Sequence, residues 1–348
     1  MLLPELFSPV SLSDVLTARN RFAMAAMTRG FADKQHRATP AIAEYYRKRA
    51  AGGTALILTE GVVIHPSADG YNDVPHIAND EQAASWKPVI EGVHKEGALI
   101  ACQLWHCGRI SHSDYTGGLP PVSSTNRAAE GINRQNGKPF GTPVALDEAG
   151  IRAVYGQFVD AAKRALGAGF DAVQLHCGHG YLADQFLDAR VNDRTDRYGG
   201  SVENRCRFVL ELLEATLAAV PANRVMMRIS PSRFMGSLYD WPDLEEMVSY
   251  LLPRLWERGL RMLDISCANA NYFDTSGRVI RMARPLWPGI ILGGASLKPE
   301  DAAAEVRAGL LDLVTWGRFM IANPDLAARV REGKPLAEFS YDTLKELV

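Results

Sequence analysis

The chain has 348 residues, enough to bury one large hydrophobic core, and single α/β barrels commonly exceed about 250 residues. Apolar residues make up 47% and charged residues 22%, which excludes collagen-like, coiled-coil and wholly disordered proteins. The 38 Lys and Arg residues nearly balance the 40 Asp and Glu residues without blocks of like charge, so the expected partners are small molecules rather than nucleic acid or a membrane.

Short apolar runs of strand length recur along the chain and are typical of strands buried on both faces. The eight expected strands cover residues 21–24, 55–58, 99–103, 172–175, 225–229, 262–265, 289–292 and 313–315. Helical periodicity between them predicts helices over residues 40–51, 81–95, 147–168, 202–220, 244–258 and 299–308. The alternation implies a parallel sheet, and eight strands without a topological break favour a (β/α)8 TIM barrel, as one domain over residues 1–348, over an open doubly wound sheet.

The longest irregular segment, residues 109–142, follows the third expected strand and is rich in Gly, Pro, Ser and Asn. A loop of this length inside a compact domain is usually a functional lid or insertion. On a barrel it would overhang the end that carries the active site.

The chain shows no sign of export or of a cysteine framework. Residues 1–10 lack the basic-then-apolar pattern of a signal peptide, and no apolar run reaches the ~18 residues of a membrane span, so a cytoplasmic protein is expected. An odd number of cysteines without a CxxC pair disfavours disulfides and a zinc or iron–sulfur cluster. The cysteines expected to be free thiols are Cys102, Cys107, Cys177, Cys206 and Cys267.

Polar and aromatic residues crowd the ends of the first four expected strands, where barrel enzymes carry their reactive groups. These residues are Ala25, Ala26, Met27, Thr28 and Arg29 after the first strand; Thr59, Glu60 and Gly61 after the second; Gln103, Trp105 and His106 after the third; and His176, Cys177, Gly178, His179, Gly180 and Tyr181 after the fourth.

Arg228 lies inside the apolar run 225–229, where a cation is costly unless an anion or several acceptors meet it. It is either part of a structural ion pair or a contact to a ligand. Glycines after the seventh and eighth strands fit a phosphate site as well as ordinary turns, because barrels build such sites from these loops. The residues concerned are Gly293, Gly294, Ala295, Gly317 and Arg318.

His176 and His179 are three residues apart and admit three interpretations. A metal pair is disfavoured because they lie at a strand end and no third ligand is close in sequence. They are otherwise core histidines or hydrogen-bond donors aimed at a ligand oxygen. Tyr71 and Trp105 are likewise either core aromatics or pocket walls.

Several of these motifs together resemble Old Yellow Enzyme, in the order that this family keeps. The segments carrying the resemblance are residues 7–12, 20–21, 24–29, 103–109, 169–176, 179–187, 192–205 and 317–326, nearly the whole chain.

The resemblance implies non-covalently bound FMN at the barrel mouth, with NADPH or NADH as reductant. It implies that Thr28 lies near a flavin carbonyl oxygen and that Gln103 and Arg228 bond the pyrimidine edge. The phosphate would be held by Gly294, Ala295, Gly317 and Arg318, and further flavin contacts would come from Ala25, Ala26, Met27, Gly61, His176 and Gly293.

The same resemblance implies reduction of activated carbon–carbon double bonds. His176 and His179 would hold the substrate oxygen, Tyr181 would donate a proton, and Tyr71 and Trp105 would line the pocket. Because no dinucleotide-binding motif is seen, the nicotinamide and the substrate are expected to use one site in turn, with ping-pong kinetics. The alternatives are a related flavin barrel used for isomerisation, desaturation or nitro or nitrate-ester reduction, and a barrel that binds ligand without turnover.

Four residues depart from the family pattern. Ala26 stands where many relatives have proline, Gly61 where alanine is common, and Cys177 and Gly178 where Gly-Ala is usual. The flavin potential and the substrate range are therefore left open.

Overall fold

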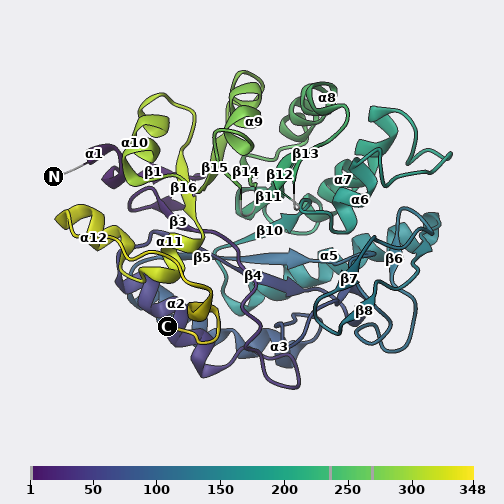
Figure 1. The fold of residues 1–348 in the computed structure, drawn as a ribbon, viewed down its shortest axis with the longest axis horizontal. Helices are drawn as coiled ribbons and strands as arrows, with labels where there is room; N and C mark the ends of the chain where they lie inside the picture. The colour runs from purple at the N-terminus through teal and green to yellow at the C-terminus, as the bar shows by residue number, and fades with distance from the viewer. Residues whose placement is uncertain (1–2, 235–236, 268–269) are drawn as a thin grey trace.

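Eight parallel strands close into a barrel in the computed structural model, which describes residues 3–234, 237–267 and 270–348. Going around the barrel, each strand pairs with its neighbour in chain order, and the last pairs with the first (Figure 1). The strands are β3 (Phe22–Met24), β4 (Leu56–Val63), β5 (Leu99–Trp105), β10 (Ala172–His176), β11 (Val225–Ile229), β14 (Met262–Ile265), β15 (Ile290–Ala295) and β16 (Leu313–Trp316). The predicted (β/α)8 barrel and all eight predicted strands are confirmed.

Helices surround the barrel, and several begin at a capping side chain. Asp147 accepts a hydrogen bond from Gly150 N at 2.7 Å, and the helix that it caps ends at Gly169 with φ of 111°. The helices are α1 (Pro4–Phe7), α2 (Pro40–Ala51), α3 (Asp80–Ser85), α4 (Lys87–Lys95), α5 (Glu148–Ala168), α6 (Leu182–Leu187), α7 (Val202–Leu217), α8 (Leu244–Glu257), α9 (Ser276–Ala283), α10 (Pro299–Arg307), α11 (Arg318–Ala322) and α12 (Leu326–Glu332).

The helix predicted over residues 81–95 is wrong in one respect, because it is two helices that meet at Trp86. Pro88 lies in the first turn of α4, where a missing N–H does no harm, whereas inside one long helix its ring would clash with the preceding turn. The sequence analysis also missed α1, α6, α9 and α12, most of which are too short to show a clear period.

The barrel interior is built in layers, because side chains alternate between its two sides along each strand. In the lower layer, an apolar cluster includes Ala101 and Ala172, which pair between β5 and β10, and Met226 and Met262, which pair between β11 and β14. The hairpin β1–β2 (Val10–Ser11 and Thr17–Ala18) adds its own apolar residues to this cluster. The base of the barrel is thus a packed core, and the polar residues come one step further along each strand.

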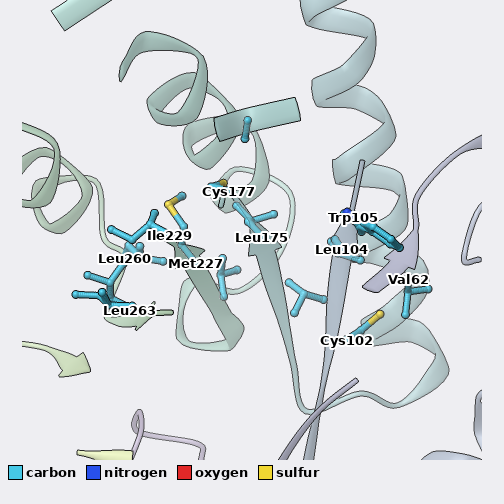
Figure 2. Close-up of a cluster of buried hydrophobic side chains, with 14 of the residues drawn as sticks. Val62, Cys102, Leu104, Trp105, Leu175, Cys177, Met227, Ile229, Leu260 and Leu263 are labelled. Carbon is cyan, nitrogen blue, oxygen red and sulfur yellow. The ribbon is translucent and has the colours of Figure 1, made fainter. Parts of the chain in front are cut away.

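The opposite side of the strands packs against the helices. Figure 2 shows outward-facing side chains of neighbouring strands gathered into one buried cluster, among them Leu104, Leu175, Met227 and Leu263. All are 0% exposed. These strands are therefore buried on both faces, as the continuous apolar runs predict for a parallel sheet.

The long connection after β5 contains four short strands and contacts the loops at the carboxyl ends of other strands. The strands are β6 (Val122–Ser123), β7 (Ile132–Asn133), β8 (Lys138–Pro139) and β9 (Val144–Ala145). Gln135 receives hydrogen bonds from the N–H and the side chain of Asn72, and Ser124 Oγ donates to Gln185 O at 2.6 Å. The predicted extended loop after the third barrel strand is therefore confirmed. A second hairpin, β12–β13 (Ser232–Phe234 and Leu238–Asp240), follows β11.

All five cysteines are free and buried, as the sequence predicts. No helix in the described ranges is long and apolar enough to cross a bilayer.

Phe208 provides a test of the helical layer. Its ring is fully buried and stacks on Phe186 at 4.1 Å and against Tyr155 at 5.1 Å. Phe208→Ala should lower the free energy of unfolding by about 3–5 kcal/mol, because it removes buried apolar surface and leaves a cavity. Urea unfolding measures the change. Leu119→Ala, at a side chain 64% exposed, is the control and should change it by less than about 0.5 kcal/mol. Equal effects would contradict the assigned core.

Candidate active site

A cavity of about 580 Å³ opens at the carboxyl ends of the barrel strands. This volume is in the usual range for a cofactor or small-molecule site. Its lining comes from β11, β15 and β16, from the loops after β3, β10 and β14, from the start of α11, and from the segment near residue 339. The lining residues are Ala25, Ala26, Met27, Thr28, His179, Tyr181, Arg228, Ser266, Ala270, Ala295, Ser296, Thr315, Gly317, Arg318, Phe319, Glu338 and Phe339.

A larger hollow of about 820 Å³ lies at the opposite end, where residues before the barrel strands line it. The two arginines in its lining already have partners in the protein. Arg284 donates to Asp312 and to a backbone oxygen, and Arg261 donates to Trp256 O. Barrel enzymes carry their chemistry at the other end. The smaller cavity is therefore the candidate site.

The structure brings ten of the residues singled out in the sequence around this cavity and leaves seven outside its lining. Those that line it are Ala25, Ala26, Met27, Thr28, His179, Tyr181, Arg228, Ala295, Gly317 and Arg318. Those behind or beside it are Gly61, Tyr71, Trp105, Gln103, His176, Gly293 and Gly294. Lining residues that the sequence analysis missed are Ser266, Ala270, Ser296, Thr315, Phe319, Glu338 and Phe339.

Arg228 is part of a buried ion pair and also lines the cavity. Its Nε lies 3.4 Å from Asp264 Oδ2 on the neighbouring strand, and both side chains are buried. Nη1 donates to Ala26 O at 3.2 Å and Nη2 to Ser266 Oγ at 2.5 Å, so the far edge of the guanidinium faces the cavity wall. The ion pair offsets the desolvation of the cation and holds it at the site.

A buried polar chain connects Arg228 to Gln103 across the barrel interior. Gln103 Nε2 donates to Gln174 Oε1 at 2.7 Å, and Gln174 Nε2 donates to Asp264 Oδ2 at 3.1 Å. Burial raises the pKa of Asp264, and Arg228 opposes that shift. These side chains form the layer directly above the apolar base. Gln103 is thereby connected to Arg228 through the side chains of Gln174 and Asp264.

The loop after β10 holds two histidines in a tight turn. His179 has φ of 57° and the following Gly180 has φ of 78°, both left-handed, and a non-glycine residue adopts this conformation at some cost. His179 N donates to Ser230 Oγ at 2.5 Å. The His176 and His179 rings lie 5.4 Å apart. Burial, and then the charge of Arg228, lower the pKa of both histidines well below the usual value, so both are neutral at pH 7.

Asp184 fixes the same loop from below and was missed in the sequence. Its fully buried carboxylate accepts from Gly180 N at 2.6 Å and from Trp241 Nε1 at 2.9 Å, and it pairs with Arg233 at 2.7 Å. Burial raises the pKa of Asp184 to about 6, against the effect of Arg233. Ser230 and Asp184 therefore hold two consecutive N–H groups of the turn.

Three aromatic side chains form the wall next to the histidines. Tyr71 lies 4.7 Å from the Trp105 ring, and Tyr181 lies 4.9 Å from Trp105 and 5.1 Å from His176, measured between ring centroids. The two tyrosine hydroxyls are 2.7 Å apart. Tyr181 reaches the cavity itself, while Tyr71 and Trp105 support it from behind.

Two departures from the family pattern have steric reasons. A Cβ on Gly61 would lie 2.5 Å from the Trp105 ring, and a Cβ on Gly178 would lie 2.9 Å from Ser230 N. Real contacts are never that short, so alanine at either position would require its neighbours to move. These glycines allow the Trp105 ring and the Ser230 backbone to approach.

The first strand and the C-terminal segment meet beside the cavity. Glu60 Oε2 accepts from Arg29 N at 2.9 Å and from Gly30 N at 3.0 Å, directly after Thr28. Arg29 Nη2 donates to Glu346 O at 2.7 Å. Arg318 Nη2 donates to Tyr341 Oη at 3.1 Å, and its guanidinium lies 5.1 Å from the Phe339 ring. These contacts attach the segment that supplies Glu338 and Phe339 to the wall.

Comparisons with known proteins agree with this geometry. The model of the NADH:flavin oxidoreductase / NADH oxidase family matches residues 5–337. The chain belongs to this family. The earlier resemblance to Old Yellow Enzyme is thereby confirmed, and the protein is an oxidoreductase.

Named relatives of this NADH:flavin oxidoreductase span nearly its whole length. It is 36% identical over 306 residues to a protein named putative 12-oxophytodienoate reductase 11 of Oryza sativa subsp. japonica, covering 86% of this chain and 83% of that one. It is 36% identical over 328 residues to a probable flavin mononucleotide-dependent alkene reductase of Leishmania infantum, covering 91% and 88%. The solved Old Yellow Enzyme homologue from Zymomonas mobilis superposes with a TM-score of 0.91 at 32% identity, covering 97% and 96%.

The residues around the cavity fit the FMN of this family. A dianion suits the glycine-rich turn of β15, where Gly294 has φ of 148° and Ala295 of 51°, together with the Arg318 guanidinium on the same wall. His176 Nδ1 is buried without a hydrogen-bond partner among the described residues. A buried donor or acceptor left unpaired is costly, which is consistent with a ligand completing the site.

The buried carboxyl group of Glu60 should make the free energy of unfolding of this NADH:flavin oxidoreductase depend on pH. Burial raises the pKa of Glu60 from 4.5 to about 7. A carboxyl with a raised folded-state pKa contributes stability below its unfolded pKa, and that contribution is lost as the pH rises through about 7. Glu60→Gln removes the titration but keeps an acceptor for the Arg29 and Gly30 N–H groups. Relative to the wild type, the variant should therefore gain up to about 3 kcal/mol in free energy of unfolding between about pH 4.5 and pH 7.

Urea unfolding across this pH range measures the difference. Leu119→Ala, which changes no titratable group at an exposed position, is the control and should differ from the wild type by a constant amount. A constant difference for Glu60→Gln as well would show that this carboxyl titrates normally.

Proposed function

We propose that this NADH:flavin oxidoreductase reduces activated carbon–carbon double bonds of α,β-unsaturated carbonyl compounds, with NADPH or NADH as electron donor. The observation that carries the proposal is that neutral His179 and protonated Tyr181 line one cavity together with Arg228, while the neutral His176 ring packs against both of them. Bound FMN supplies the hydride transfer between the nicotinamide and the substrate. The protein side chains would bind the substrate oxygen and supply the proton.

Residues at three places would hold FMN. Thr28, Gln103 and Arg228 would bond the polar edge of the ring, with Ala25, Ala26 and Met27 beside it. A fixed guanidinium favours negative charge on the reduced ring, and the buried Asp264 keeps that guanidinium in place. The phosphate would lie against Gly293, Gly294, Ala295, Gly317 and Arg318.

His176 and His179 would hold the substrate oxygen. An enone oxygen gains negative charge as a hydride reaches the β-carbon, and donors fixed in advance stabilise that charge. Both imidazoles are neutral, so each can donate through one ring N–H without carrying a charge of its own. The bonds from Ser230 and Asp184 to the loop backbone support this role, because they fix the turn that carries His179.

Tyr181 would protonate the α-carbon. Burial, with smaller contributions from Tyr71 and Cys107, raises the pKa of Tyr181 well above 10, so the phenol is fully protonated at neutral pH. It lies on the same turn as His179 and lines the same cavity. The residues proposed to hold FMN and those proposed to hold the substrate line the same cavity. The nicotinamide and the substrate would therefore enter it in turn.

An anaerobic titration tests the proposed function. The purified protein should be yellow, NADPH or NADH should bleach it, and 2-cyclohexenone should restore the colour, because each half-reaction proceeds without the other reactant. Initial-rate patterns should be ping-pong. Bleaching without reoxidation by the enone would favour another reaction of the same flavin site, such as nitro or nitrate-ester reduction, and a protein that takes up no FMN would end the proposal.

Tyr181→Phe should separate the two half-reactions. The variant keeps the ring but loses the proton, so enone reduction should slow by about 10²-fold while flavin reduction by the nicotinamide is spared. Anaerobic stopped-flow absorbance measures both rates in the same preparation. An equal fall in both rates would assign Tyr181 a structural role.

A further inference from the structure

The hydroxyl of Tyr181 has a second tyrosine as its hydrogen-bond partner. Tyr71 Oη and Tyr181 Oη are 2.7 Å apart, and either oxygen can be the donor. The two residues are 110 positions apart in sequence and come from the loops after β4 and β10. Such a short contact between two phenols, one of which lines the cavity, requires that both loops be held in place.

The loop that carries Tyr71 is fixed by a buried carboxylate. Asp69 Oδ1 accepts from Gly70 N at 2.6 Å and from Tyr71 N at 3.1 Å, and Asp69 Oδ2 accepts from His76 Nε2 at 3.0 Å. Asp69 and His76 are almost fully buried. Ser111 Oγ donates to Asp69 O at 2.5 Å.

These groups serve the loop rather than a metal. His36 stacks on His76 with ring centroids 3.8 Å apart and planes 14° apart, close to Asp69. The lone pairs of stacked parallel imidazoles lie in their own ring planes and do not converge on one ion. Both carboxylate oxygens of Asp69 already accept hydrogen bonds, from Gly70 N, Tyr71 N and His76 Nε2. The cluster therefore pre-organises the Tyr71 backbone, and the Trp105 ring fixes the side chain.

The direction of the hydrogen bond follows from the proposed role of Tyr181. If Tyr181 gives its proton to the substrate, its O–H must point at the α-carbon, and its oxygen is then free to accept. Tyr71 must in that case be the donor. We propose that Tyr71 is a relay residue that donates its hydroxyl hydrogen to Tyr181 and returns a proton to it after each turnover. This inference rests on the proposed ene reduction.

The proton steps balance without a further reactant. The O–H bond of Tyr181 breaks and a C–H bond forms at the substrate α-carbon, while the electron pair stays on the Tyr181 oxygen. The Tyr71 proton then moves 2.7 Å to that oxygen. Water returns a proton to Tyr71. As the Tyr181 O–H breaks, the existing bond from Tyr71 strengthens, because a phenolate is a better acceptor than a phenol.

The position of Tyr71 suits a path to solvent. Its side chain is half-buried, and the next residue, Asn72, is exposed. Asn72 accepts from Tyr115 Oη at 3.0 Å and contacts Gln135 of the long loop after β5. Tyr181, in contrast, faces the cavity, where bound reactants would exclude water. Tyr71 thus joins the reacting phenol to the outer side of the loop.

The test compares Tyr71→Phe with Tyr115→Phe in the FMN-loaded enzyme. Tyr71→Phe keeps the ring on Trp105 and removes only the hydroxyl, so enone reduction should slow about tenfold, the size of one lost hydrogen bond to a reacting group. KM for the enone, flavin reduction by NADPH, and reoxidation by oxygen, which needs no proton at carbon, should stay unchanged. Tyr115→Phe removes a hydroxyl that touches the same loop but not Tyr181, and should leave every rate unchanged.

A double-mutant cycle and the solvent isotope effect distinguish a proton-relay role of Tyr71 from a purely structural role in the pocket wall. Adding Tyr71→Phe to Tyr181→Phe should cause no further loss, because the relay has no acceptor left. The solvent isotope effect on the enone half-reaction should differ from the wild type in Tyr71→Phe and should be unchanged in Tyr115→Phe. An unchanged enone rate, or a raised KM with unchanged kcat, would overturn the relay. Failure of the wild type to reduce the enone would instead overturn the proposed function, so the two failures are distinguishable.

Discussion

The buried ion pair between Arg228 and Asp264 constrains everything at the mouth of this barrel. A guanidinium inside a parallel strand is costly to desolvate, and it is kept because the carboxylate beside it and the oxygens of Ala26 and Ser266 meet its donors. Asp264 is held in turn by Gln174. The cation therefore cannot move toward solvent. Its charge also adds to burial in lowering the pKa of both histidines at the end of the neighbouring strand β10, so that they stay neutral.

The histidine turn illustrates how such a site is held in shape. The left-handed φ of His179 has a conformational cost, and the bonds that the turn makes to Ser230 and Asp184 offset it. Asp184 is itself buried with Arg233, so a second ion pair lies beneath the same loop. One buried ion pair supplies the Arg228 charge that adds to the effect of burial on the pKa of both histidines. The other includes Asp184, which holds the backbone of the turn that carries His179.

The sequence predicted the barrel because each strand is a continuous apolar run, and it predicted Arg228 because a cation interrupts one of them. It did not reveal Asp264 or Gln174, which lie inside runs of the same kind and matter only through register with neighbouring strands. Asp184 was missed for a similar reason, and Glu60 was named at a strand end without its partner. Their partners, Arg233 and the Arg29 backbone, are far away in the chain and become neighbours only when the barrel closes.

The departures from the family pattern show the same dependence on distant partners. From the sequence alone, Gly61 and Gly178 are departures that leave the flavin potential and the substrate range open. In the structure each removes an overlap, one with the Trp105 ring and the other with the Ser230 backbone. Trp105 then packs on Tyr71 and Tyr181, and Ser230 accepts from His179. The smaller residue therefore tightens the active-site wall, because the space that it vacates is filled by a group that positions a functional side chain.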